Sequence, residues 1–235
     1  MLAADYRPFP VRAAALQFST GATLDSTIET VIASVLGQFV ANWPVLTETR
    51  HLESIHQLRV ALRRLRTALA FFDRCLPCAE FGIFRAEAKR IASALAPARD
   101  LDAFRQLIED GPRACYAHEG ESFEALLTTI EDRRMAAYAI AQNIIEDPST
   151  TRFVLKLRAF LAHKGWRNAL SGAELLRLTE PATPQACVET ARGATPGPNS
   201  AQEHSLYCRI LQFFLRRCST LYPSGFQTPG WARRF

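Results

Sequence analysis

The chain has 235 residues and a formal net charge of +5, with 48% hydrophobic and 22% charged residues, which are ordinary proportions for a soluble globular protein. The most apolar run, Val31 to Val40, is too short to cross a bilayer and contains Gln38, so the sequence predicts no membrane-spanning helix. Six cysteines are too few for a disulfide scaffold, and charged residues at 5, 7 and 12 interrupt the N-terminus where a secretory signal would be apolar. We therefore expect a reducing, cytoplasmic location.

Apolar residues at spacings of three and four predict a helix that begins near Thr23. Pro44 is expected to end it, because proline lacks the amide hydrogen that a helix interior needs. The same periodicity predicts a second helix from about Thr49 to Cys75 and a third from Glu80 to Leu95. Pro97 then interrupts the pattern.

Three further helical segments follow, at Asp100–Glu109, Glu121–Ile145 and Thr151–Ala162. Short breaks join them, and no run of alternating β-branched residues predicts a strand. The sequence therefore predicts an all-α protein built as an antiparallel helix bundle.

The periodicity divides the chain into three parts. Residues 1–22 are predicted to be an N-terminal linker, and residues 23–178 the helical domain. Four prolines and two glycines fall between residues 179 and 204, so we expect residues 179–235 to be a divergent, poorly ordered segment. Within it, only Leu206–Leu221 regains a helical pattern.

The basic residues are mostly arginine: of 28, 25 are Arg and 3 are Lys. A GC-rich genome produces the same skew without any function. Arginine is also the side chain that grips phosphate with a planar, two-pronged guanidinium group. The positions of the arginines must decide between these interpretations.

Residues 56–66 place four arginines and a histidine together without an acid among them. At 100° per residue, His56, Arg59, Arg63 and Arg66 fall within an arc of about 80°, with neighbours about 5 Å apart along the helix. Arg64 points elsewhere. The opposite side of the helix, which we expect to face the core, carries Leu58, Leu62, Leu65, Leu69 and Phe72.

Like charges one turn apart repel each other by roughly 0.3 kcal/mol per pair, so this row is costly without a counterion. One interpretation is a solvated basic face, although such faces usually mix the two signs of charge. The other is an anion site, and a linear polyanion fits a linear row best.

The third predicted helix adds further cations at Arg85, Lys89 and Arg90. If this helix packs antiparallel to the second, it extends the positive surface. Glu87 lies among these residues and dilutes the signal.

Two aspartates, Asp100 and Asp102, stand near the predicted start of the next helix, where carboxylates cap free amides and complement the helix dipole. Positions two apart on a helix point in different directions, which disfavours a metal shared between them. Arg99 either pairs with these acids or joins the basic surface.

Two of these motifs together resemble the CHAD family, the conserved-histidine α-helical domain, over about residues 23–178. They are His56-x-x-Arg59-Val60-x-x-Arg63-Arg64-Leu65-Arg66 and, later in the chain, Leu95-x-x-x-Arg99-Asp100-Leu101-Asp102. The opening segment, Phe9-Pro10-Val11-Arg12-Ala13, also resembles the close of a CYTH-type triphosphate-tunnel domain, which often precedes a CHAD domain.

The resemblance implies two four-helix bundles related by a pseudo-twofold axis, with a basic groove that binds inorganic polyphosphate. It implies neither catalysis nor a metal or cofactor. The binding residues carried over to this chain are His56, Arg59, Arg63, Arg66, Lys89 and Arg90, with Arg64, Arg85 and Arg99 as secondary candidates.

The chain departs from the family pattern in two places. Ala96 stands where the family usually has glycine, and no segment matches the basic helix of the family's second bundle. We hypothesise that the chain beyond about residue 180 is truncated or read in a shifted frame; a genomic reading frame that also lacks the basic helix would contradict this. An incomplete second bundle would expose an apolar stripe, and therefore predicts a homodimer or poor solubility.

The sequence thus predicts a non-enzymatic polyphosphate-binding protein, located in the cytoplasm or at polyphosphate granules. One alternative is binding of a nucleic-acid phosphate backbone by the same row, although nothing near the row offers base readout. Another is an inactive remnant of a CYTH–CHAD inorganic triphosphatase. Hydrolysis would require an acidic metal cluster, for which Asp100 and Asp102 are the only candidates.

Overall fold

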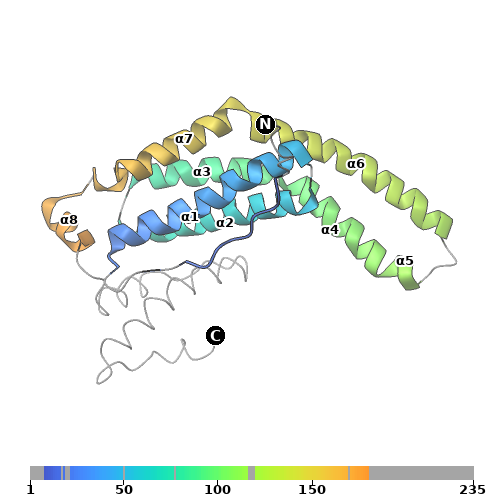
Figure 1. The fold of residues 1–235 in the computed structure, drawn as a ribbon, viewed down its shortest axis with the longest axis horizontal. Coiled ribbons are helices and arrows are strands. Elements are labelled where there is room, and N and C mark those ends of the chain that lie inside the picture. The colour runs from blue at the N-terminus through green and yellow to red at the C-terminus, as the bar shows by residue number, and fades with distance from the viewer. Residues whose placement is uncertain are drawn as a thin grey trace, which may run out of the picture.

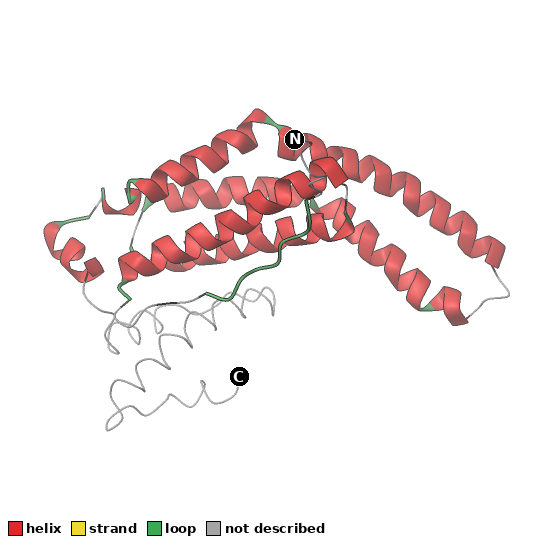
Figure 2. Cartoon of the chain, in the orientation of Figure 1, coloured by secondary structure: helices red, strands yellow, loops and turns green. Residues whose placement is uncertain are grey.

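The computed structural model describes residues 8–16, 18, 22–49, 51–76, 78–115, 120–168 and 170–179. The regular elements in these ranges are all helices (Figure 2), which confirms the predicted all-α class. In chain order they are α1 (Leu24–Pro44), η1 (Val45–Thr49), α2 (Leu52–Cys75), α3 (Ala79–Ala94), α4 (Ala96–Asp110), α5 (Pro112–Cys115), α6 (Gly120–Glu146), α7 (Pro148–Ala162), η3 (Gly165–Arg167) and α8 (Gly172–Thr179). The predicted Leu206–Leu221 helix and the expected disorder of residues 180–235 lie outside the described residues.

Helices α1, α2, α3 and α7 form an antiparallel four-helix bundle (Figure 1). Each packs against two of the others, so that α2 and α7 both contact α1 and α3. The core between them contains aliphatic residues and the buried rings of Phe72, Phe81 and Trp166. The bundle is therefore closed on its own apolar faces.

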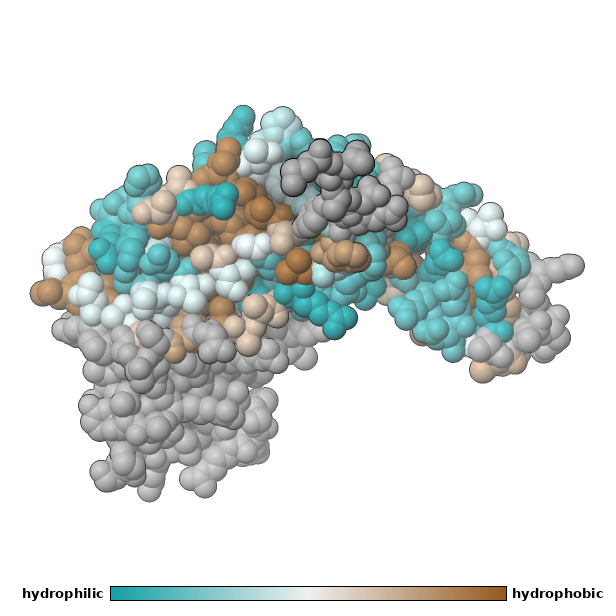
Figure 3. Space-filling model, in the orientation of Figure 1, coloured by the Kyte–Doolittle hydropathy of each residue, from teal (hydrophilic) through white to brown (hydrophobic). Residues whose placement is uncertain are grey.

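Helices α4 and α6 leave this bundle as a long hairpin that carries α5 near its tip (Figure 1). Its outer part has a small core of its own, made by Ile108, Leu127 and Ile130. Hydrophilic residues cover most of the hairpin face seen in Figure 3. Leu126 on α6 is 40% exposed, because one small cluster buries only a narrow stripe of the helix.

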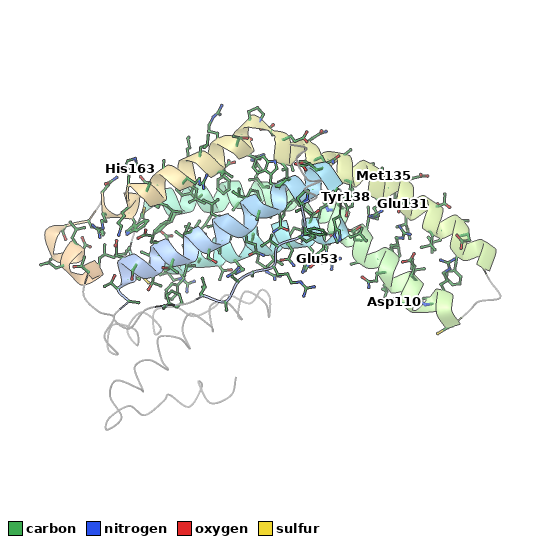
Figure 4. The ribbon with its side chains drawn as sticks, viewed as in Figure 1. Glu53, Asp110, Glu131, Met135, Tyr138 and His163 are labelled. Carbon is green, nitrogen blue, oxygen red and sulfur yellow. The ribbon has the colours of Figure 1, made fainter. Side chains whose placement is uncertain are left out.

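A buried carboxylate joins the two helices of the hairpin. Asp102 is 8% exposed and accepts hydrogen bonds from Arg134 Nε at 2.6 Å and from Tyr138 Oη at 2.9 Å. Figure 4 shows Tyr138 on α6 near the base of the hairpin. The expectation that Asp100 and Asp102 cap a helix start was wrong: α4 begins at Ala96, and no side chain caps it.

The two predicted proline breaks have different outcomes. Pro44 is the last residue of α1, as predicted, and the chain then continues as the π-helix η1, in which Thr49 Oγ1 donates to the carbonyl of Val45 at 2.6 Å. Pro97 lies in the first turn of α4, where the missing hydrogen costs nothing. The break falls at Leu95 instead.

The continuous helix Leu24–Thr49 is long and apolar enough to cross a membrane by length and composition, contrary to the sequence prediction. Half of its most apolar window is buried inside the protein. A core helix of a bundle satisfies the same criteria.

The corner after α7 is held to the start of α1 by ion pairs. Buried Asp25 accepts hydrogen bonds from Lys164 Nζ at 2.7 Å, Trp166 Nε1 at 2.9 Å and Arg167 Nε at 2.9 Å. Burial alone would raise the pKa of this carboxyl, but the three donors outweigh burial and lower the pKa to about 2. Asp25 therefore stays ionised and fixes the closing contact of the bundle.

Candidate functional site

The candidate site is built on α2, whose two faces differ in chemistry as predicted. The five predicted apolar positions are all buried. On the other side His56, Arg59, Arg63 and Arg66 are half-buried, so their charged ends lie at the surface of the bundle. The amphipathic pattern of the helix alone fixes this arrangement.

Helix α3 lies beside the row and is tied to α2 at two points. Arg59 Nη1 donates to the carbonyl of Ala92 at 3.2 Å, and Arg85 Nη1 lies 3.7 Å from Asp73 Oδ2. Lys89 falls between Arg85 and Ala92 on the same stripe of α3 and is exposed. The antiparallel register therefore brings Lys89 alongside the middle of the α2 row.

A further cation reaches the row from α4. The start of α2, marked by Glu53 in Figure 4, lies beside the base of the hairpin. Burial lowers the pKa of His56 and Glu53 opposes this shift, while the charges of Arg99, Arg63 and Arg59 lower the pKa further. Arg99 was only a secondary candidate in the sequence; the structure brings it to the row.

The same crowding acts on Arg59. Burial lowers its pKa most; Asp100 opposes the shift, and the neighbouring charges of Arg63 and Arg99 add to it. An arginine remains charged at any physiological pH, so Arg59 stays a cation despite this shift. Asp100 of α4 is the acid whose charge acts on Arg59, and Arg63 and Arg99 are the cations that oppose it.

Arg64 is turned away from the row, as predicted. Its Nη1 donates to Gln38 Oε1 at 2.7 Å, Gln38 Nε2 donates to Gln57 Oε1 at 2.9 Å, and Gln57 Nε2 donates to Glu53 Oε1 at 2.6 Å. This chain of hydrogen bonds joins α1 to α2. Sequence reasoning missed both glutamines, although two amides on otherwise apolar faces were an available signal.

Arg90 is not brought to the α2 row. Its Nη2 donates to Ser149 Oγ on α7 at 2.8 Å, and its Nε donates to Glu87 at 3.0 Å. Consecutive residues of a helix diverge by about 100°, so Lys89 and Arg90 lie on different faces of α3. The site residues named from the sequence therefore divide between two faces of the bundle.

The two aspartates considered as a metal pair have separate surroundings. Asp102 is buried against Arg134 and Tyr138, whereas Asp100 is exposed near Arg59. In the part of the chain that the structure describes, no group of three acidic, histidine or cysteine side chains is placed to hold a metal ion.

Comparison with known proteins agrees with this architecture. A family model for the CHAD domain matches residues 30–199, which is most of the chain. The chain belongs to the CHAD domain family. CHAD domains are associated in general with polyphosphate binding.

The fold is also similar to the crystal structure of the CHAD domain from the plant Ricinus communis. The TM-score is 0.58 at 23% sequence identity, and the alignment covers 94% of this chain and 72% of the plant chain. At this identity the likeness supports the CHAD fold alone. No curated protein matches the chain significantly.

Proposed function

We propose that this CHAD protein binds inorganic polyphosphate, without altering it chemically, on the α2 surface formed by His56, Arg59, Arg63, Arg66, Lys89 and Arg99. One observation carries the proposal: three helices contribute cations to one surface, and the charges of Arg63 and Arg99 both act on His56 and on Arg59, where they add to the lowering of the pKa that burial causes. Such a concentration of like charge is costly until an anion binds to it.

The chemistry of the α2 surface suits a repeating phosphate chain. Guanidinium groups bind phosphate oxygens through pairs of charge-assisted hydrogen bonds. The row presents such groups along a helix, one turn apart, and a linear polyanion presents its charges in the same way. The bond from Arg59 to the Ala92 carbonyl holds one guanidinium in place before the ligand arrives.

A binding role agrees better with the acids present than hydrolysis does. Hydrolysis of a phosphoanhydride commonly needs carboxylates that hold a metal near the scissile bond. Asp102 is instead engaged by Arg134 and Tyr138. We expect no phosphate release from polyphosphate with Mg²⁺ or Mn²⁺; release that is lost on replacing either aspartate would establish an enzyme instead.

Calorimetry with long-chain polyphosphate at two salt concentrations tests the proposal. The double variant Arg63→Gln/Arg66→Gln is expected to bind about 10- to 100-fold more weakly, and to reduce the slope of log K against log salt by roughly 1 to 2. The matched control, Arg133→Gln/Arg158→Gln, removes two exposed charges elsewhere on the protein and should bind like the wild type.

Single-stranded DNA serves as the competing ligand in the same experiment. Equal affinity for DNA and polyphosphate, or an equal loss in both double variants, would mean that the α2 surface is only a charged face. A cytoplasmic or granule location and homodimerisation remain predictions, which fluorescence microscopy with a polyphosphate stain and sedimentation velocity would test.

A further inference from the structure

Helix α7 carries basic residues but no acid. Residues 148–162 include Arg152, Lys156 and Arg158 and lack Asp and Glu altogether. Arg152 and Lys156, with His163 directly after the helix, fall within an arc of about 40° at 100° per residue. Figure 4 shows His163 at this end of α7.

This stripe faces solvent. All three of its side chains are exposed, and the buried side of the helix is formed by Thr150, Phe153, Val154 and Leu157. Among the described residues, no ion pair involves Arg152 or Lys156, whereas solvated helix faces usually alternate the two signs of charge. Within the described ranges, the charges of the stripe therefore have little local compensation.

Arg90 extends the stripe from the neighbouring helix. Its bond to Ser149 Oγ places its guanidinium at the first turn of α7, on the same side as Arg152. The pKa of Asp147 is lowered, first by its hydrogen bonds with Ser149 and then by the charges of Arg90 and Arg152, so both cations lie near the start of the helix. Three acids lie at this end: Glu87 pairs with Arg90 at 3.0 Å, and Glu146 and Asp147 precede the helix, so none of them lies along the part of the stripe formed by Arg152 and Lys156.

The stripe and the α2 surface lie on different sides of the bundle. Helices α2 and α7 each pack against both α1 and α3, which makes them diagonal partners in a four-helix arrangement (Figure 1). Lys89 and Arg90 are adjacent in the sequence of α3. Lys89 lies beside the α2 row, whereas Arg90 contacts α7. The protein thus has two basic surfaces on different faces of the bundle, one on each side of α3.

We propose that Arg90, Arg152, Lys156 and His163 form a second polyanion-binding surface, the α7 surface, which engages a separate stretch of a long polyphosphate chain. This inference rests on the proposed function for the identity of the ligand. Polyphosphate is favoured over single-stranded nucleic acid because that class of ligand is usually held by aromatic side chains that stack on bases, and the stripe contains none.

The test compares three double variants of the full chain by calorimetry, with long-chain polyphosphate, with tripolyphosphate and with single-stranded DNA. Arg152→Gln/Lys156→Gln removes charge from the α7 surface, Arg63→Gln/Arg66→Gln from the α2 surface, and Arg133→Gln/Arg158→Gln from neither. Arg158 is a matched control because it is exposed on the same helix but lies about 120° from the stripe. Circular dichroism verifies that each variant keeps the helix content of the wild type.

We expect the α7 variant to bind long-chain polyphosphate about tenfold more weakly than the wild type, and the slope of log K against log salt to fall by roughly 1 to 2. Its affinity for tripolyphosphate should stay within about twofold of the wild-type value. Long-chain binding equal to that of the control variant would overturn the α7 surface while leaving the α2 surface intact. Absence of polyphosphate binding by the wild type would overturn both proposals. A loss confined to single-stranded DNA would reject polyphosphate as the ligand of α7.

Discussion

At the scale of single residues, His56 is the group in the α2 surface whose charge can change near neutral pH. Burial, together with Arg99, Arg63 and Arg59, lowers its pKa below the ordinary 6.5, so the free protein holds a neutral imidazole at pH 7. A neutral ring donates one hydrogen bond, whereas a protonated ring donates two and adds a charge. Protonation of His56 near neutral pH therefore becomes favourable when a bound anion compensates for the positive charges of the neighbouring arginines.

Polyphosphate affinity is accordingly expected to depend on pH through His56. A bound polyanion raises the pKa of His56, so binding takes up a proton and strengthens as the pH falls through the pKa of the complex, levelling off below the pKa of the free protein. Titration calorimetry between pH 8 and 5.5, in buffers of different ionisation enthalpy, measures this proton uptake. The His56→Gln variant should lose this proton uptake and keep only the contribution of the terminal phosphates of polyphosphate, which titrate in both proteins. A pH profile equal to that of the wild type would contradict the role given to His56.

Asp25 predicts a different pH dependence, that of stability. Its pKa is about 2 in the folded protein against an ordinary 3.8, so its ion pairs contribute fully above pH 3.8, and the contribution is lost as the pH falls toward 2. The shift corresponds to roughly 2 kcal/mol. Urea unfolding of Asp25→Asn should show a loss of about this size at pH 6 and little difference from the wild type near pH 2; equal losses at both pH values would contradict the assignment.

At the scale of elements, the hairpin of α4 and α6 depends on one polar contact near its base. Asp102 pairs with Arg134, whose side chain is 12% exposed, and Arg134 also binds Glu131, labelled in Figure 4. Burial and the nearby Asp102 raise the pKa of Tyr138, which keeps its hydroxyl protonated as a donor. Arg99 lies one turn before Asp102 on α4. The contact between Asp102 and Arg134 therefore also sets the position of Arg99 in the α2 surface.

Asp102→Ala is therefore expected to cost roughly 3 kcal/mol of unfolding free energy, since it leaves a nearly buried guanidinium without its main partner. Tyr138→Phe removes only one hydrogen bond and should cost about 1 kcal/mol. Urea denaturation followed by circular dichroism measures both losses. If the two variants were equally stable, Arg134 would not depend on Asp102 in the way described.

At the scale of the whole molecule, two basic surfaces on different faces of the bundle make the protein bivalent toward a long anion. The net charge of +5 understates this property, because the cations gather on α2 and α7 while ion pairs such as Arg105 with Glu131 neutralise charge on the hairpin. A bivalent protein and a multivalent chain can link to each other repeatedly.

Long-chain polyphosphate is therefore expected to cross-link the protein into large particles near charge balance, whereas tripolyphosphate should not. Dynamic light scattering at low salt measures particle size, and added salt should dissolve the particles because it screens the contacts. Arg152→Gln/Lys156→Gln should still bind through α2 but no longer form particles. Particles of wild-type size in that variant would show that cross-linking does not need α7.

The sequence by itself determined the secondary structure and the basic row of α2. Periodicity at three and four residues predicted the main helices because the same spacing decides which face of a helix can be buried. The row followed because His56, Arg59, Arg63 and Arg66 belong to a single helix, where geometry is local. Pro97 was misjudged for an equally local reason: in the first turn of a helix, the missing amide hydrogen has no partner to lose.

Tertiary structure alone decided which other residues join the row. Arg99 comes to His56 because α4 starts beside α2, and Asp102 turns inward because α6 supplies Arg134 and Tyr138. Lys89 and Arg90 are neighbours in sequence but lie on different faces of the bundle, since α2 packs on one side of α3 and α7 on the other. Contacts between helices join residues that are far apart in the sequence, so no short motif can reveal them.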